Sequence, residues 1–411
     1  MKNYTQNIFF VLAFFLVAAN LRPAIASVSP LLETIRNELG MSSFAVSFLT
    51  TIPVLCMGIF APFSARLGIR WGIERMIMIC LVVIGTMTFM RALSSSSLFL
   101  LVTTLFIGIA IAIAGALLSG FIKRMFPAHA ASMMGVYSVG LGVGTSLSAG
   151  FTIPLQGVLQ GSWTLALAVW SVLAIIALLF WWPVMAKGAQ NPNAVPSTQG
   201  EGKLPWKNKR AWLFTIIFGL QASLYYSIVT WLAPMTEALG LSKVYAGVAI
   251  TVFTFVQMIC SLVIPIAVNY YHHRRIWLIG CSLITLIGLA FFFFSYMISV
   301  WISIILLGIG LGGLLPLSMM LPLYETSTVH DASAWTALVL SVGYIFAGCI
   351  PTIIGWVHDI SGSYQSSYIG MTILCSVLLV FSFSARTGQE HKIMHSNKED
   401  NKKLTDSDIA N

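Results

Sequence analysis

The sequence predicts an all-α integral membrane protein with twelve transmembrane helices arranged as two six-helix pseudo-repeats. Three observations support this fold class: the composition, the recurrence of long apolar stretches, and a weak internal repeat. Hydrophobic residues make up 58% of the 411 residues and charged residues only 9%. A soluble globular domain carries charge on about a quarter of its residues, so the composition favours a chain that crosses a bilayer many times.

Each predicted span is a stretch of roughly 20 mostly apolar residues, the length that crosses the hydrocarbon core of a bilayer. Residues 8–27 are interpreted as part of the first span and not as a cleaved signal peptide, because Arg22 and Pro23 interrupt the apolar run. The twelve stretches lie at about 8–30, 44–65, 74–93, 97–122, 133–155, 163–186, 211–234, 244–270, 276–297, 300–322, 334–357 and 365–385.

Two polar segments divide the chain. Residues 187–210 are basic and rich in Pro, Gly and Asn, which predicts a solvated cytoplasmic linker loop. Residues 387–411 form a charged tail without periodicity, which predicts a disordered cytoplasmic segment. The predicted organisation is therefore an N-terminal six-helix half at 1–186, the linker, a C-terminal six-helix half at 211–386, and the tail.

The positions of Lys and Arg predict the orientation in the membrane. With the N-terminus in the cytoplasm, 18 of the 22 Lys and Arg residues fall on the cytoplasmic side. Arg36, Arg91 and Lys243 fall in outer loops, and Arg22 alone lies inside a span. This bias predicts a multi-pass protein of the cell membrane (inner or plasma) with both termini in the cytoplasm. It also explains the net charge of +9 without nucleic-acid binding.

The two predicted halves share a weak internal repeat. Three short matches recur at nearly constant offsets of 200, 200 and 203: LGMS at 39–42 with LGLS at 239–242, IGIA at 107–110 with LGIG at 307–310, and SVG at 138–140 with SVG at 341–343. Transporters built from parallel repeats place the substrate site near the bilayer midplane, between the halves.

Three segments carry a family resemblance: NLRPAIASVSPLLETIRNELGMSSFAVSFLTTIPVLCMGIFAPFSARLGIRWGIERMI at 20–77, FIKRMFP at 121–127 and SVGYIFAGCIPTIIGWVHDISGSY at 341–364. The chain resembles the major facilitator superfamily and, within it, the branch of cyanate permeases and nitroimidazole transporters. The resemblance implies the twelve-helix fold and secondary transport by alternating access. It also implies a small anionic or strongly polar solute, such as a cyanate-like anion or a nitro-heterocycle.

One segment departs from the superfamily's pattern. The loop between the second and third helices usually reads GxxxDRxGRR, whereas residues 61–71 read APFSARLGIRW. Ala65 stands where the family has Asp, while Arg66 and Arg70 remain. The resemblance makes these two arginines gating candidates, although the interhelical charge network of the missing Asp cannot form in its usual way.

Arg22 is the leading candidate for a substrate-binding residue. It lies 14 residues after Ile8, which is roughly 21 Å along a helix and past the middle of a ~30 Å hydrocarbon core. A cation there costs at least ~2.5 kcal/mol on insertion scales. None of the 13 acidic residues falls in the middle of a span, so the expected partner is an anionic or strongly polarised substrate. The alternative is an Arg that reaches the outer interface or binds carbonyls freed by Pro23.

The seventh span supplies the candidates that face Arg22. Aligning the halves at an offset of 203 or 204 places Tyr225 or Tyr226 opposite Arg22. Gln221 shares a helix face with Tyr225, and an amide beside a phenol can hydrogen-bond an anion or a polar ring. The alternative interpretation of the tyrosines is packing at the membrane interface.

Further polar residues are weaker candidates. Asn20 lies two positions from Arg22, so a regular helix would point it elsewhere. Gln257 in the eighth span and Tyr344 in the eleventh either contact the substrate or join helices. His358 and Asp359, at the outer end of the eleventh span, either form a proton-sensitive gate or cap a helix end.

These observations favour a secondary active transporter over two alternatives. A multidrug-type exporter of apolar compounds would not need Arg22, and a membrane-embedded enzyme or sensor would need a buried catalytic set or a soluble domain. No nucleotide-binding loop is present, and the six cysteines lack CxxC spacing, so no cofactor or metal is predicted. The expected partners are a small-molecule solute and the lipid bilayer, with a coupling proton left open, and a monomer is expected.

Overall fold

In the computed structural model every regular element among the described residues is a helix, and no strand occurs among them. Twelve segments of this part are long and apolar enough to cross a membrane, which confirms the predicted fold class. Most of the predicted linker and the whole of the predicted tail lie outside the described residues, so the domain division remains a prediction. The described residues are 2–93, 95–126, 129–188, 204–270, 274–294, 297–326 and 328–385.

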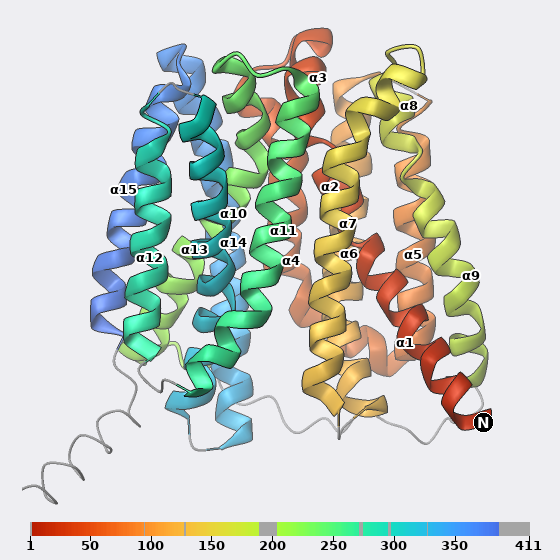
Figure 1. Cartoon of the computed structure of the whole chain (residues 1–411). Helices are drawn as coiled ribbons and strands as arrows, with labels where there is room; N and C mark the ends of the chain where they lie inside the picture. Colours follow the sequence, from red (N-terminus) through yellow and green to blue (C-terminus); the bar gives the residue numbers. More distant parts are fainter. Residues whose placement is uncertain are drawn as a thin grey trace, which may run out of the picture.

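The helices of the first and second halves of the chain stand side by side as two groups (Figure 1). We call the end at which α1 begins the inner end and the end at which α3 lies the outer end. The first group comprises α1 (Lys2–Asn20), α2 (Pro23–Ala26), the 3₁₀ helix η1 (Ser29–Leu31), α3 (Leu32–Leu39), α4 (Ser43–Trp71), α5 (Ile73–Met90), α6 (Ser97–Met125), α7 (Ala130–Val158), α8 (Trp163–Ala168) and α9 (Ser171–Gly188). The second group comprises α10 (Lys209–Ala238), α11 (Lys243–Tyr270), α12 (Arg274–Phe291), α13 (Met297–Glu325), α14 (Val329–Ser361) and α15 (Tyr364–Ser384).

The first span is a broken helix. α1 ends at Asn20, and the four-residue α2 begins at Pro23 with Arg22 as its N-cap. Proline causes this break because it lacks an N–H group and its ring collides with the preceding turn. After α2, η1 and α3 continue outward, so the span runs over Phe9–Leu39 instead of about 8–30. Arg36 therefore lies on the helix α3, whereas the sequence analysis predicted an outer loop.

Close packing of α7 against α1 fixes the inner side of this break. A β-carbon at Gly144 would overlap the carbonyl oxygen of Ala19, so only glycine allows the two backbones to approach this closely. At Gly140 a β-carbon would lie 2.8 Å from the β-carbon of Ala18. The residue before the break is thereby held against a long, continuous helix.

Polar contacts between the two halves gather in the outer part of the bundle. The Ser29 hydroxyl donates to the carbonyl oxygens of Val229 and Thr230 at 2.5 and 3.1 Å. Thr230 donates to Thr50 at 2.8 Å, and the hydroxyls of Thr51 and Thr352 also lie 2.8 Å apart. The described contacts therefore correspond to a state that is closed at the outer end.

Two ion pairs at the inner end each stay within one half. Arg124 of α6 pairs with Glu74 of α5, and Arg210 of α10 pairs with Glu325 of α13. These contacts hold the helix ends of each half together without joining the halves. The polar contacts at the two ends of the bundle are thus asymmetric.

Candidate functional site

Arg22 contacts the facing half through Tyr226 of α10. Its Nη1 donates a hydrogen bond to the Tyr226 hydroxyl at 3.1 Å, and its Cζ lies 5.9 Å from the centre of the Tyr226 ring. Arg22 keeps part of its surface accessible, whereas Tyr226 is buried. The contact joins the two residues that the offset of 204 places opposite each other.

Four tyrosines from three helices gather around Arg22. The Tyr226 ring centre lies 5.1 Å from that of Tyr225 and 6.4 Å from that of Tyr344 in α14. Tyr137 of α7 completes the set: its ring centre lies 6.1 Å from that of Phe14 in α1, and its hydroxyl lies beside Gly115 of α6, as does the side chain of Leu21. We call Arg22 and these four residues the tyrosine cluster.

The tyrosine cluster offers a cation, hydroxyl groups and aromatic faces at the boundary between the halves. Arg22 has five N–H donors. Among the described residues, one of them is used, in the hydrogen bond to Tyr226. No carboxylate forms an ion pair with Arg22 within the described part of the chain. The remaining donors suit a planar anion or polar group, which guanidinium binds in bidentate fashion.

Tyr137 is a residue of the tyrosine cluster that the sequence analysis missed. It lies three residues before Gly140 and seven before Gly144, on the face of α7 that packs on α1. Because that glycine face meets α1 just before the break, the i, i+3, i+7 spacing is the sequence signal that could have identified Tyr137.

The three predicted amide side chains are buried but make no hydrogen bond to Arg22. Asn20 and Gln221 are 2% and 1% exposed, and Asn20 Nδ2 and Gln221 Oε1 have no hydrogen-bond partner among the described residues. Gln257 lies on α11, where its backbone faces Gly312 of α13. A buried amide atom without a partner costs about 1–3 kcal/mol, so Asn20 and Gln221 remain candidates for solute contacts.

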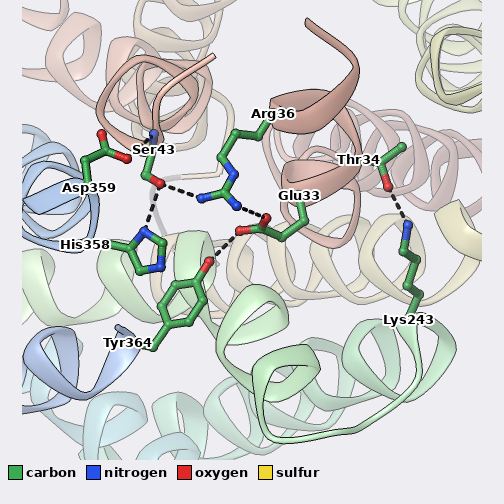
Figure 2. A network of polar contacts seen from close by, with 8 residues as sticks. All are labelled: Glu33, Thr34, Arg36, Ser43, Lys243, His358, Asp359 and Tyr364. Carbon is green, nitrogen blue, oxygen red and sulfur yellow. Dashed lines mark hydrogen bonds and ion pairs between the residues drawn. The ribbon is translucent and has the colours of Figure 1, made fainter. Parts of the chain in front are cut away.

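His358 and Asp359 sit in a polar contact between the outer ends of the two halves (Figure 2). The Asp359 carboxylate accepts hydrogen bonds from the backbone N–H groups of Ser43 and Phe44, each at 2.8 Å. His358 Nδ1 lies 3.0 Å from the Ser43 hydroxyl. Asp359 of α14 therefore binds the free N–H groups at the start of α4, where a helix favours negative charge.

Further charged and aromatic residues surround this contact. Arg36 donates to the Ser43 hydroxyl at 2.8 Å and pairs with Glu33 at 2.8 Å. The Tyr364 hydroxyl of the C-terminal half donates to Glu33, and Lys243 donates to Thr34 at 2.8 Å. We call the eight residues drawn in Figure 2 the outer cluster: Glu33, Thr34, Arg36, Ser43, Lys243, His358, Asp359 and Tyr364.

Arg66 and Arg70, the other two gating candidates, lie far from the outer cluster. Both are exposed residues near the inner end of α4, whereas Ser43 stands at the outer start of the same helix. The structure thus places the four predicted gating residues at opposite ends of the bundle.

The fold and the paired polar sites between its halves define a class, that of two-half helical membrane transporters. A family model of the Major Facilitator Superfamily matches residues 8–348. The chain therefore belongs to this superfamily, as its sequence resemblance predicted.

Relatives in two bacteria support this membership over nearly the whole chain. The 2-nitroimidazole transporter of Escherichia coli (strain K12) is 29% identical and covers 91% of this chain and 94% of its own. The cyanate transport protein CynX of the same organism is 30% identical, with 90% and 95% covered. The uncharacterized transporter YycB of Bacillus subtilis (strain 168) is 29% identical, with 96% and 97% covered. The family and these relatives are transporters, not enzymes.

Solved structures show the same fold at low sequence identity. A bacterial homolog of the human lysosomal transporter Spinster superposes with a TM-score of 0.73 at 16% identity, covering 94% of this chain and 97% of its own. A D-xylose-proton symporter superposes with a TM-score of 0.73 at 13% identity, covering 92% and 99%.

Proposed function

We propose that this protein moves a small anionic or strongly polar solute across the cell membrane by alternating access, with Arg22 as the solute's electrostatic anchor. The observation that carries the proposal is the contact of Arg22 with Tyr226 across the two halves. A group shared by both halves can bind solute from either side as the halves rock around it. Because both parts of the site come from one chain, a monomer suffices for transport.

The chemistry of the tyrosine cluster favours a planar solute. Guanidinium binds planar anions or polarised oxygens, and tyrosine rings stack on flat molecules while their hydroxyl groups hydrogen-bond to polar edges. Cyanate-like anions and nitro-heterocycles both meet these requirements, and relatives carry names of both kinds. An exporter of apolar drugs fits less well, because an apolar solute would leave the guanidinium of Arg22 without an anionic or polar partner beyond Tyr226.

The outer cluster supplies the outer gate in this proposal. It joins the halves through Asp359 at the start of α4 and through the contact of Tyr364 with Glu33. Opening the outer end requires these contacts to separate, and closing it remakes them. Arg66 and Arg70 stand at the inner end of α4, where they would act on the opposite gate.

Transport assays with purified protein in proteoliposomes test this function. We expect saturable uptake of cyanate, 2-nitroimidazole or another member of a panel of small anions and nitro-heterocycles. Each solute is measured with and without an imposed pH gradient, and stimulation by the gradient would identify a coupling proton. Transport confined to uncharged apolar drugs would instead support the exporter alternative.

Orientation in the membrane gives a separate prediction. Reporter proteins fused after Lys203 and after Lys392 should both be active in the cytoplasm, and a reporter fused after Lys243 should be active outside. The reason is the distribution of Lys and Arg, 18 of which fall on the predicted cytoplasmic side. A reporter in the central linker that is active outside would contradict the assigned orientation.

A further inference from the structure

Arg91 is a second arginine inside the N-terminal half, and unlike Arg22 it is fully buried. The sequence analysis places it in an outer loop, but the structure shows it at the end of α5 with its side chain 0% exposed. Its Nη1 donates to the carbonyl oxygen of Ala24 at 3.0 Å, and its Nη2 donates to the Thr104 hydroxyl at 2.9 Å. The predicted loop position of Arg91 is therefore wrong. Its long side chain extends from the end of α5 back into the protein interior.

The hydrogen bond to Ala24 satisfies a carbonyl that the broken first span leaves without a backbone partner. α2 has four residues, so its carbonyl groups lie at a helix end and have few helical N–H partners. Ser27 N–H donates to Pro23 and Val28 N–H donates to Ile25, which leaves the carbonyl of Ala24 between them. In a membrane protein such a group must find another donor. Arg91 is that donor.

The same arginine links α2 to the neighbouring helix α6. Thr104 lies in α6, and its hydroxyl donates to the carbonyl of Leu100 at 2.7 Å, which fixes its orientation. Arg91 therefore bridges α2 and α6 with two N–H groups of one planar guanidinium. An ammonium group is not planar and could not hold both acceptors in this geometry.

Arg22 is the N-cap of α2, two residues before the carbonyl that Arg91 binds. We propose that Arg91 is a positioning residue for the solute site: it holds α2 in place and thereby aims the Arg22 guanidinium at Tyr226 and the solute. The inference rests on the proposed role of Arg22 as solute anchor. Arg91 itself contacts Ala24 and Thr104, not the tyrosine cluster.

Thiol labelling at position 22 tests the positioning step without any solute. In a chain whose native cysteines are replaced by serine or alanine, Arg22→Cys is labelled with a small methanethiosulfonate reagent. Adding Arg91→Met should change the labelling rate about tenfold or more, because α2 loses the bond that holds it. Arg91→Lys and Thr104→Val should each change it less, since one contact can remain.

Thr152→Val is the matched control for labelling. It removes a buried hydrogen bond of the same half, the one that Trp170 Nε1 donates to Thr152 at 2.9 Å, which is not part of the Arg91 contacts. We expect the labelling rate to be unchanged in this variant. An unchanged rate in Arg91→Met and Thr104→Val, or an equal change in the control, would overturn the positioning role. Thr104→Val keeps the test valid should Arg91→Met fail to fold.

A double-mutant cycle on uptake of cyanate and 2-nitroimidazole tests the link to solute binding. Arg91→Met should raise KM about tenfold with Arg22 present, and should have almost no further effect in the Arg22→Lys background. Independent, additive effects on KM would overturn the inference even though Arg22 binds solute. A changed labelling rate with KM unaffected by Arg22→Lys would instead overturn the role of Arg22 and the inference with it.

Discussion

Replacing Arg22 with alanine is expected to lower solute affinity ten- to a hundredfold while the protein still inserts and folds. Losing a charge-assisted hydrogen bond costs about 1.5–3 kcal/mol, which corresponds to that range of affinities. Insertion should be unharmed, because the variant removes a cation from the apolar part of a span. The measurement compares uptake and binding of cyanate and 2-nitroimidazole with the amount of monodisperse protein recovered from the membrane.

Two further variants separate the chemistry of this anchor from its charge. Arg22→Lys keeps the charge but loses the planar fork, so affinity should still fall. Tyr226→Phe removes the hydroxyl that accepts from Arg22, and it should weaken binding less than Arg22→Ala. Tyr368→Phe is its control, because Tyr368 is a buried tyrosine of the same half whose hydroxyl bonds to Met235 instead. If most of the Arg22→Ala protein misfolds while the folded fraction in the membrane binds solute normally, Arg22 serves only to satisfy backbone groups.

The spans and one central contact could be predicted from the sequence because each depends on a strong physical signal. Apolar stretches of membrane length fix the number of spans whatever their tertiary packing. The internal repeat carries positional information across the halves: offsets of 203 and 204 pair Arg22 with Tyr225 or Tyr226, and the structure shows the contact with Tyr226. A cation inside a span, with no acidic residue in the middle of any span, also narrows the choice of partner to polar residues or solute.

Arg91 and the outer cluster could not be predicted for a different reason. Their contacts depend on how long the first span is and on how the two halves are tilted, and periodicity determines neither. The break at Pro23 is visible in the sequence, but η1 and α3 continue the span to Leu39. They bring Glu33 to Tyr364 of the facing half and Arg36 to Ser43. Charge alone favours loop positions for Arg36 and Arg91, since Lys and Arg usually mark the ends of spans.

Asp359→Asn is expected to shift the protein from the outward-closed state toward a state that is open at the outer end. The carboxylate binds two N–H groups at the start of α4, and an anion at a helix N-terminus contributes up to about 1–2 kcal/mol. Asn keeps one acceptor oxygen and loses the charge, so the equilibrium between the two states should change about five- to thirtyfold. Gly355 shows how close this contact is, because a β-carbon there would lie 2.6 Å from the carbonyl oxygen of Ser43.

Distances between spin labels at Asn37 and Ser361 report this shift. Both residues are exposed at the outer end, one in each half, and can be labelled as cysteines in a chain without native thiols. The parent should give one short distance population, and Asp359→Asn should add a longer one. Asp331→Asn is the matched control on the same helix, because Asp331 interacts with Thr328 at the inner end of α14. Equal distributions in the parent and in Asp359→Asn would show that the remaining contacts of the outer cluster, led by Tyr364 with Glu33, hold the gate closed without the carboxylate.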